Sequence, residues 1–283
     1  MSRELPTPLE RTAFCLDYDG TVSPIVSDPA AAEPLDGFVE LLGRLARRAA
    51  AVALVSGRPA EFLAARAPAP GLRYYGQYGL EEIRDGELVA DPEIEAVRPE
   101  VRAAIEEVRA DQAVRDSGAY VEDKGIAVGI HLRRVAEPER WSDAIAAIAE
   151  RIARRHGLEV QPGKLVWELR PAIHRDKGDA VRKVLAEVRP AGLLVAGDDL
   201  GDLPAFAAAA GAEGVDAVRV AVRSAETPPR LLAEADVAVD GPRGLLDYLS
   251  RGEQRSPLEA PPSARRGSGL KGGGGRQAPP LAR

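Results

Sequence analysis

The segment FCLDYDGTVSPI, residues 14–25, decides the fold class. Its apolar beginning has the character of a buried strand. The strand ends in two carboxylates, Asp17 and Asp19, which Gly20 and Thr21 follow at once. A near-continuous apolar run is typical of a strand in a parallel sheet that helices cover on both faces. In such sheets ligands bind in the crevice beyond the carboxyl ends of the strands, which is where these acidic residues belong.

Helical patterns alternate with short apolar runs on both sides of the middle of the chain. Residues 35–50 place apolar side chains at helical spacing, namely Leu35, Phe38, Val39, Leu42 and Leu45. The apolar runs AVALVS and LRYYGQYG follow, and the alternation resumes later with DKGDAVRKVLAEV, GLLVAGDD, VRVAV and ADVAVDG. This β-α-β alternation predicts an α/β fold with a Rossmann-like parallel sheet.

The middle of the chain departs from this alternation after IRDGELV, whose Asp-Gly pair predicts a hairpin turn. Helix-like stretches over residues 93–110 and 139–156 each precede two strand-like segments, first AYVEDK and IAVGIHLRR, then LEVQ and KLVWELR. We therefore expect an inserted αββαββ cap at residues 87–170. The remaining core is discontinuous and comprises residues 11–86 and 171–251.

The composition is that of a globular protein with mixed charge. The 283 residues carry a formal net charge of −6, so no positive field favours nucleic acid or an anionic membrane. The single cysteine, Cys15, excludes a disulfide framework. No apolar stretch has the length of a membrane span and the N-terminus has no signal-peptide pattern, so we expect a cytoplasmic protein. We also expect it to be a monomer. Residues 252–283 are rich in Ser, Pro, Arg and Gly, which predicts a disordered tail.

Polar side chains gather at the ends of the predicted strands and at one helix start. In chain order they are Asp17 and Asp19, then Ser56, Gly57 and Arg58 in ALVSGR, then Lys177 in DKGDA, then Asp198, Asp199 and Asp202 in LLVAGDDLGD. Each group alone has an ordinary explanation as a turn, a helix cap or an exposed charge. Their shared position beyond the strands favours one common site.

Several carboxylates in one crevice repel one another, and a buried unpaired charge is strongly destabilising. These groups therefore either bind protons or share a hard cation. Oxygen ligands together with water and a phosphate oxygen suit Mg²⁺. A second acid two residues after the first can handle a proton while the first attacks, which favours phosphoryl transfer over dehalogenation.

The motifs DYDGT, SGR, DKG and GDDLGD, in this order, resemble the four motifs of haloacid dehalogenase-superfamily phosphatases over nearly all of residues 12–250. The resemblance implies that Asp17 is a nucleophile forming an aspartyl-phosphate and that Asp19 is the general acid and base. It also implies that Ser56 and Lys177 hold the phosphoryl group. The remaining implied roles are Mg²⁺ binding by Asp17, the main-chain carbonyl of Asp19 and Asp198, support from Asp199 and Asp202, and phosphate contacts from Gly20, Thr21 and Gly57.

The predicted cap strands carry charged side chains on one face, which in a free-standing domain would be a solvated face. Over a phosphatase crevice that face would instead bind sugar hydroxyls. VEDKG…HLRR and GKLVWELRP…DKG are similar to trehalose-6-phosphate phosphatases, the family that hydrolyses this sugar phosphate in the last step of trehalose synthesis. The resemblance implies that the chain binds a small sugar phosphate. It also implies sugar contacts from Glu122, Lys124, Arg133, Lys164 and Glu168, with Arg58 contacting sugar or phosphate.

One segment departs from the family pattern, and other functions stay open. The family often has an Asn-His or Ser-His pair before Gly-Leu-Glu, where this chain has Gln77 and Tyr78 in GQYGLE. The alternatives are the same chemistry on another sugar phosphate, such as sucrose phosphate or mannosylglycerate phosphate, and a non-enzymatic switch in which a partner phosphorylates Asp17. A nucleotide-binding module is disfavoured because no Gly-rich phosphate loop is present.

Overall fold

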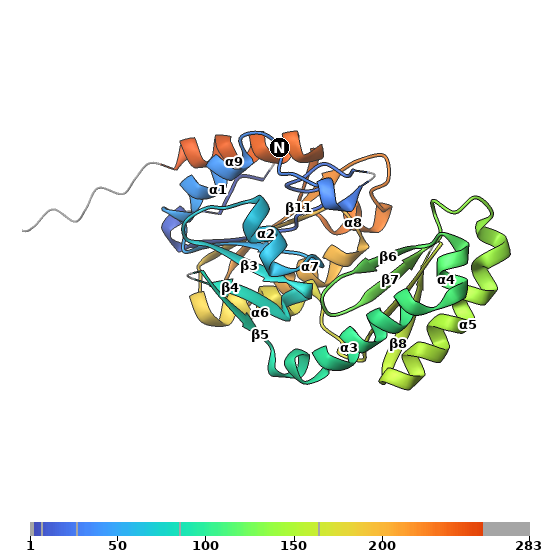
Figure 1. Ribbon diagram of the computed structural model, residues 1–283. Helices are drawn as coiled ribbons and strands as arrows, with labels where there is room; N and C mark the ends of the chain where they lie inside the picture. Colours follow the sequence, from blue (N-terminus) through green and yellow to red (C-terminus); the bar gives the residue numbers. More distant parts are fainter. Residues whose placement is uncertain (1–2, 7, 27, 85, 164, 257–283) are drawn as a thin grey trace, which may run out of the picture.

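The computed structural model describes residues 3–6, 8–26, 28–84, 86–163 and 165–256 (Figure 1). The chain forms a larger core and a cap that projects from one side of it, on the right in Figure 1. The core contains an eight-stranded sheet and the cap a separate four-stranded sheet. This arrangement confirms the predicted fold class, an α/β core with an inserted cap.

The core sheet is parallel except at one edge, where β4 and β5 run antiparallel to their neighbours. Strand β1 lies in the interior of the sheet between β10 and β2, and all five of its residues are buried. In pairing order the strands are β12 (Val237–Asp240), β11 (Asp216–Arg223), β10 (Gly192–Gly197), β1 (Thr12–Leu16), β2 (Ala51–Val55), β3 (Leu72–Gly76), β4 (Glu81–Arg84) and β5 (Glu87–Ala90).

Helices cover both faces of the core sheet, as the apolar runs predict. Phe14 and Leu16 point into one apolar cluster, whereas Ala13 and Cys15 point into the other, because side chains alternate along a strand. The first cluster is closed by α1 (Phe38–Ala46), α2 (Ala60–Arg66) and α9 (Gly241–Arg255). The second is closed by α6 (Lys177–Val188), α7 (Leu203–Ala210) and α8 (Pro229–Glu234).

The cap packs its helices on one face of an antiparallel sheet and leaves the other face to the core. Its helices are α3 (Pro92–Ala110), α4 (Gln112–Ser117) and α5 (Pro138–His156), and they share one apolar cluster with the sheet. In pairing order its strands are β6 (Tyr120–Asp123), β7 (Val128–His131), β9 (Val166–Pro171) and β8 (Leu158–Gly163). The predicted order of helices and strand pairs is present, with α4 as an additional short helix.

The predicted boundaries need correction at four points. The core begins before residue 11, because Leu5 and Leu9 are buried in its first apolar cluster, and Pro171 belongs to cap strand β9. Glu87–Ala90 is not part of the cap, because it forms β5 and pairs with β4 through the expected hairpin. The core also extends beyond residue 251, because α9 continues to Arg255. A strand pattern does not show which sheet the strand joins, and a helical pattern does not show at which residue the helix ends. The predicted tail from residue 257 onward lies outside the described residues.

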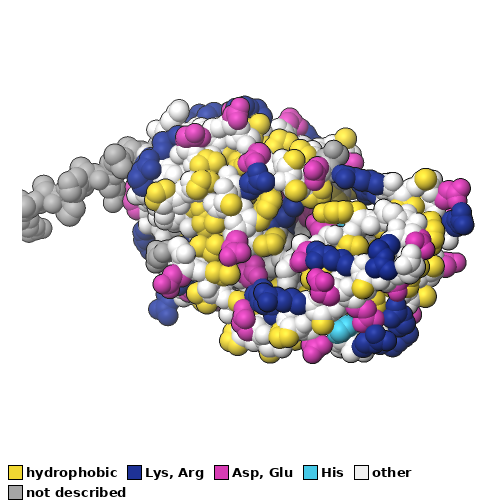
Figure 2. Space-filling view, viewed as in Figure 1, with side chains coloured by type: hydrophobic (Ala, Val, Ile, Leu, Met, Phe, Trp, Pro, Cys, Tyr) yellow, Lys and Arg dark blue, Asp and Glu magenta, His cyan; other side chains and the backbone are white. Residues whose placement is uncertain are grey.

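The surface agrees with the mixed composition. Figure 2 shows Lys and Arg side chains interspersed with Asp and Glu over both the core and the cap. Within the described ranges, none of the helices combines the length and the apolar character that crossing a membrane requires.

Candidate active site

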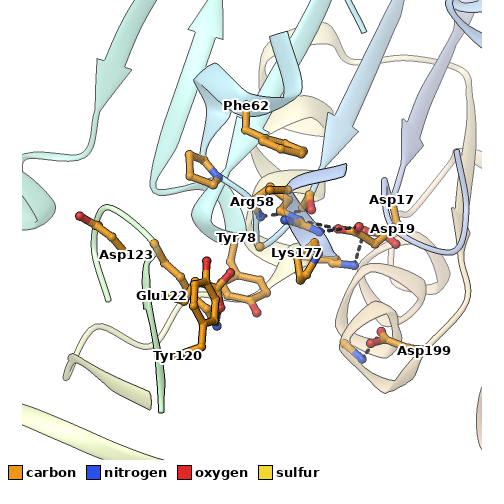
Figure 3. A pocket seen from close by; sticks show the side chains of 17 residues that line it. Asp17, Asp19, Arg58, Phe62, Tyr78, Tyr120, Glu122, Asp123, Lys177 and Asp199 are labelled. Atoms are coloured by element: carbon orange, nitrogen blue, oxygen red, sulfur yellow. Dashed lines mark hydrogen bonds and ion pairs between the residues drawn. The ribbon is translucent and has the colours of Figure 1, made fainter. Parts of the chain in front are cut away.

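A cavity of about 490 Å³ lies where the carboxyl ends of the core strands face the cap, and we call it the crevice (Figure 3). The core contributes side chains from several strand ends, namely Asp17, Asp19, Ser56, Arg58, Lys177 and Asp199. The cap contributes Tyr120, Glu122, Asp123 and Lys124. Residues from far apart in the sequence therefore meet, because parallel strands bring their carboxyl ends to one edge.

Lys177 joins two acidic side chains at the bottom of the crevice. Its Nζ donates to Asp17 Oδ1 at 2.6 Å and to Asp202 Oδ1 at 2.7 Å. All three residues are buried, with exposed fractions of 7%, 5% and 1% for Lys177, Asp17 and Asp202. Burial alone would lower the pKa of Lys177, but the attraction of Asp17 and Asp202 outweighs it and raises the pKa well above its ordinary value. The lysine is therefore held as a cation beside Asp17.

Asp202 supports the site through its contacts with the protein. Its Oδ2 accepts hydrogen bonds from the main-chain N–H groups of Asp198 and Asp199, at 2.9 and 3.1 Å. Its Oδ1 accepts from Lys177. Since both carboxylate oxygens are engaged in this way, Asp202 orients the loop after β10 and the lysine. The supporting role that the motif resemblance implies for Asp202 stays a prediction.

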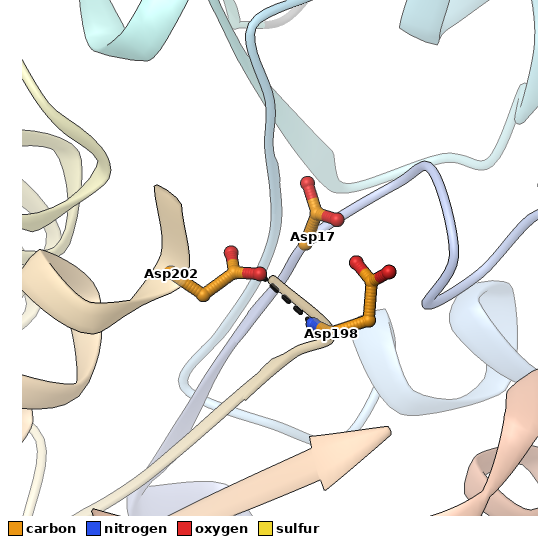
Figure 4. Close-up of side chains that lie close together, drawn as sticks. All are labelled: Asp17, Asp198 and Asp202. Carbon is orange, nitrogen blue, oxygen red and sulfur yellow. Dashed lines mark hydrogen bonds between the residues drawn. The ribbon is translucent and has the colours of Figure 1, made fainter. Parts of the chain in front are cut away.

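Acidic oxygens crowd together beside the lysine. Among the described residues, Asp17, Asp198 and Asp202 each place a carboxylate oxygen within 4.8 Å of the other two (Figure 4). Burial, followed by repulsion from Asp202 and Asp199, raises the pKa of Asp198 to about 7. Burial also raises the pKa of Asp17 well above its usual range, although Lys177 opposes the shift. The single positive charge of Lys177 does not offset the negative charges that the three carboxyl groups carry when they are ionised.

The donor set fits a hard divalent cation. The cluster offers only oxygen ligands, and a cation would offset the repulsion that raises these pKa values. Gly20 has a φ of +78° and lies against the Asp198 carboxylate, since a Cβ at residue 20 would fall 2.1 Å from Asp198 Oδ2. A glycine is required here, and its smallness admits the Asp198 side chain to the cluster. The cluster can therefore hold a metal ion.

Two of the predicted phosphate contacts do not line the crevice. Gly20 contacts Asp198, as above, and Thr21 is fully buried with a hydroxyl that has no hydrogen-bond partner in the described part of the chain. Ser56 and Gly57 do line the crevice. Ser56 Oγ accepts the N–H of Arg58 at 3.2 Å, which leaves its hydroxyl proton available as a donor.

Arg58 contacts the proposed acid and base within the core. Its Nε and Nη2 donate to the two carboxylate oxygens of Asp19, each at 2.8 Å. The guanidinium also lies 4.8 Å from the centre of the Phe62 ring. The Asp19 hydrogen bonds raise the pKa of Arg58 even though burial opposes the shift. A bidentate pair of this kind fixes the orientation of the carboxylate.

The cap side chains that reach the crevice pair with one another. Lys124 Nζ donates to Glu168 and lies 3.9 Å from Glu122 Oε2. Glu122 Oε2 shares a hydrogen bond of 2.9 Å with His131 Nε2. The pair with Glu168 raises the pKa of Lys124, although burial opposes the shift. Three of the predicted sugar contacts, Glu122, Lys124 and Glu168, thus form one charged cluster.

The other two predicted sugar contacts stand apart. Arg133 is not on the strand face shared with His131, because β7 ends at His131 and a turn follows. Arg133 instead lines a neighbouring cavity of about 510 Å³, which shares Tyr120 and Glu122 with the crevice. Lys164 lies outside the described residues. The structure thus places Arg133 beside the predicted sugar site and gives no position for Lys164.

Several lining residues escaped the sequence analysis. Phe62 lies on α2 one turn after Arg58, and Pro29 and Ala30 belong to the connection after β1. Tyr78 and Tyr120 add aromatic surface, with exposed fractions of 38% and 51%. Phe62 lies in a helical pattern, where an apolar residue is expected to be in the core. Pro29 and Ala30 lie in a loop, which has no repeating pattern from which a site could be predicted. The unusual GQYG segment was the available signal for Tyr78.

Comparison with known proteins gives consistent results. The sequence profile of the family described as Trehalose-phosphatase matches residues 15–239. The trehalose-phosphate phosphatase of Mycobacterium marinum is 36% identical over 247 residues, 85% of this chain and 61% of the relative. That of Mycobacterium leprae is 34% identical over 84% of this chain and 57% of the relative. The chain thus spans about 60% of the length of these relatives.

Solved structures agree with the fold. A trehalose-6-phosphate phosphatase related protein superposes with a TM-score of 0.70 at 27% identity, covering 86% of this chain and 97% of the other. A haloacid dehalogenase-like hydrolase from Bacteroides thetaiotaomicron superposes with a TM-score of 0.56 at 17% identity, covering 85% and 98%. At such low identity the second likeness shows the fold alone, which is haloacid dehalogenase-like.

Proposed function

The chain belongs to the trehalose-phosphatase family, and from this premise we propose that it hydrolyses trehalose 6-phosphate to trehalose and inorganic phosphate with the help of Mg²⁺. The single observation that carries the proposal is the contact between buried Asp17 and Lys177 at the bottom of a crevice whose other wall is the charged cap face. A carboxylate beside a cation suits reaction with a phosphate. A surface rich in hydrogen-bonding groups suits binding of a sugar.

Asp17 is the proposed nucleophile. One of its carboxylate oxygens would bond to the phosphorus as the bond from phosphorus to the sugar oxygen breaks, which leaves an aspartyl-phosphate. Lys177 holds Asp17 in place and offsets negative charge on the phosphoryl group, and the Ser56 hydroxyl donates to a phosphoryl oxygen. These groups converge on the crevice from β1, β2 and α6.

Asp19 is the proposed proton carrier. It would give a proton to the departing sugar oxygen and then take one from the water that attacks the aspartyl-phosphate, so that the acid is restored at the end of the cycle. In this structure both Asp19 oxygens accept hydrogen bonds from Arg58. We propose that Arg58 orients Asp19 and that substrate binding displaces at least one of these two bonds.

Asp17, Asp198 and the main-chain carbonyl of Asp19 would hold the magnesium ion. When bound, such an ion neutralises charge on the phosphate and supplies the positive charge that the acidic cluster lacks. Asp202 keeps the loop that carries Asp198 in position, and Lys177 remains the nearest cation of the protein itself.

The sugar end of the substrate would bind the cap cluster. Glu122 and Lys124 line the crevice, and Glu168 lies behind them as the partner of Lys124. A disaccharide with many hydroxyl groups can satisfy several donors and acceptors of this cluster at once. We propose that the cluster selects the sugar, whereas the core binds the phosphate. Arg133 would contribute only if the sugar extends into the neighbouring cavity.

The decisive experiment measures phosphate release from trehalose 6-phosphate with and without Mg²⁺, beside sucrose phosphate and mannosylglycerate phosphate. We expect the highest kcat/KM for trehalose 6-phosphate and reversible loss of activity in a chelator. A higher kcat/KM for another sugar phosphate would reassign the substrate but keep the chemistry. A stable phosphoenzyme without turnover on any of them would instead support a phospho-accepting switch.

A further inference from the structure

The segment GQYG lies where the core sheet, the phosphate motif and the cap meet. It follows β3 as a short 3₁₀ turn, η3 (Gln77–Gly79). Gln77 and Tyr78 both have left-handed backbone conformations, with φ of +49° and +62°. Such conformations are uncommon for residues other than glycine and persist only where surrounding contacts hold them. The contacts of these two residues therefore need an explanation.

The main chain of the segment is bound to the motif that carries the proposed phosphate contacts. The N–H of Gln77 donates to the carbonyl of Arg58 at 2.9 Å, and the N–H of Tyr78 donates to the carbonyl of Ser56 at 3.0 Å. The Tyr78 ring lies directly over Gly57, where a Cβ would fall 2.8 Å from the ring. The segment thus contacts each residue of SGR, whose side chains and main chain line the crevice.

The Gln77 side chain reaches in the other direction, into the cap. Its Nε2 donates a hydrogen bond to the main-chain carbonyl of Lys124. Gln77 is only 3% exposed, so this amide group is shielded from competing water. Lys124 is the residue whose ammonium group pairs with Glu168 in the proposed sugar cluster. One buried amide therefore connects the core to the strand end that carries the sugar contacts.

A small apolar contact accompanies this hydrogen bond. Leu80, which follows the segment, packs in one cluster with Ile94 of α3 and Ile126 of the turn between β6 and β7. The carbonyl of Leu80 also accepts the N–H of Asp91, immediately before the cap. Gly79 lies against Ala180 of α6, the helix that begins at Lys177. The segment is thus packed against both catalytic elements and cap elements.

We propose that Gln77 and Tyr78 are positioning residues that couple the closed arrangement of the cap to the phosphate motif, so that the sugar cluster and the phosphoryl site form together. This inference rests on the proposed function for its substrate but concerns how the two halves of the site are aligned. Opening of the cap breaks the Gln77–Lys124 bond and frees the segment from its cap contact. Closing restores the bond and presses Tyr78 against Gly57 and the crevice.

The proposal predicts that Gln77 is needed for its hydrogen-bond donor and not only for its size. A side chain that merely filled space at position 77 would be replaceable by one of equal size, because packing would remain. A side chain that acts through its N–H donor would not be replaceable, because the carbonyl of Lys124 would lose its partner. Gln77→Met keeps the volume and removes the donor, and Gln77→Glu places a carboxylate oxygen against the carbonyl oxygen.

The structural test measures distances between the two parts in the full chain. Glu40 of α1 and Glu150 of α5 are exposed sites for spin labels introduced with the changes Glu40→Cys and Glu150→Cys, and native Cys15 is too buried to react. We expect one main distance for the parent protein and an additional, longer population for Gln77→Met and Gln77→Glu. The control Gln254→Glu makes the same chemical change at an exposed site on α9, away from the cap, and should leave the distribution unchanged.

Two results would overturn the proposal. One is an unchanged distance distribution in both Gln77 variants, and the other is an equal change in Gln254→Glu. Circular dichroism of each variant identifies loss of folding, and Gln77→Met preserves the test if Gln77→Glu does not fold. Because this readout needs no substrate, it stands even if trehalose 6-phosphate is not hydrolysed.

Kinetics supply the second readout. Gln77→Met should lower kcat/KM for trehalose 6-phosphate about tenfold, the effect of one lost hydrogen bond to a well-shielded group, and change that for p-nitrophenyl phosphate less than about twofold. The small ester needs the phosphate motif but not the cap. Equal losses on both substrates would assign Gln77 to the stability of the core instead.

Discussion

The bottom of the crevice and the facing cap surface both carry paired charges, but they do so in different surroundings. Asp17, Lys177 and Asp202 are almost completely buried and hydrogen-bonded to one another. The side chains of Lys124 and Glu168 retain 29% and 23% of their exposure. Burial strengthens every electrostatic interaction, so each core charge depends on its partners. Water screens the cap charges, which can exchange partners with a ligand more easily.

The difference in burial indicates that the core and the cap have different roles in binding the substrate. A buried cluster with excess negative charge favours one geometry and one kind of ligand, a cation together with a phosphate. A half-exposed cluster of mixed sign has several arrangements of similar energy and can adapt to hydroxyl groups. We therefore expect core substitutions to abolish chemistry and cap substitutions to change selectivity.

Asp17→Asn should lower kcat by about four orders of magnitude or more, as loss of a nucleophile does in other hydrolases. The amide keeps the size of the side chain but does not form an aspartyl-phosphate, so no phosphoenzyme should be trapped by rapid acid quench. Asp216→Asn, on an exposed strand residue far from the crevice, is the matched control and should retain full activity. Substantial turnover by Asp17→Asn would refute the assignment of the nucleophile.

Removal of the metal should produce the next largest effect. A chelator should abolish activity, and added Mg²⁺ should restore it. Asp198→Asn should raise the Mg²⁺ concentration needed for half-maximal activity more than about a hundredfold, because even changes to residues behind the ligands cost about 10- to 100-fold. Titration of activity against free Mg²⁺ gives this value. An unchanged Mg²⁺ requirement would remove Asp198 from the metal site.

In the cap, Lys124→Ala should lower the hydrolysis of the sugar phosphate and leave that of a small phosphate ester almost unchanged. We expect kcat/KM for trehalose 6-phosphate to fall about 10- to 100-fold, since charge-assisted hydrogen bonds are the stronger ones, while p-nitrophenyl phosphate is hydrolysed within about twofold of the parent rate. Lys183→Ala removes a comparable pair with Glu82 on the core and serves as the control. Equal losses on both substrates would mean that the cap does not select the sugar.

The smallest effect concerns Glu122 and the stability of the cap. The hydrogen bond with His131, opposed by burial and aided by Lys124, lowers the pKa of Glu122 from its ordinary 4.5. The ionised form is therefore favoured in the folded cap, and its contribution is complete above that value and is lost as the pH falls through the lowered pKa. Glu122→Gln should reduce the free energy of unfolding by about 1 kcal/mol at neutral pH.

The difference between Glu122→Gln and the parent should shrink as the pH falls below 4.5 and should vanish once the pH has passed through the lowered pKa of Glu122. Both tryptophans, Trp141 and Trp167, lie in the cap, so tryptophan fluorescence during denaturation follows the cap and not the core. A difference that is constant with pH would show that Glu122 contributes through packing and not through its charge.

Much of the core and its site could be predicted from the sequence. The apolar runs predict buried parallel strands, and parallel strands necessarily bring Asp17, Ser56 and Asp198 to one edge of a sheet. The cap prediction was right in its order of elements because alternating patterns and turn residues are local signals. It was wrong at Glu87–Ala90, because a strand pattern does not state which sheet the strand joins.

The contacts between distant residues depended on the tertiary structure. Arg58 pairs with Asp19, Gln77 reaches Lys124, and Arg133, which follows the end of β7, lines the cavity beside the crevice. Local patterns report periodicity and turns, so they determine which elements form and which residues share a face. Long polar side chains select their partners only after two elements have docked, because hydrogen bonds require atoms within about 3 Å and no sequence spacing encodes that approach.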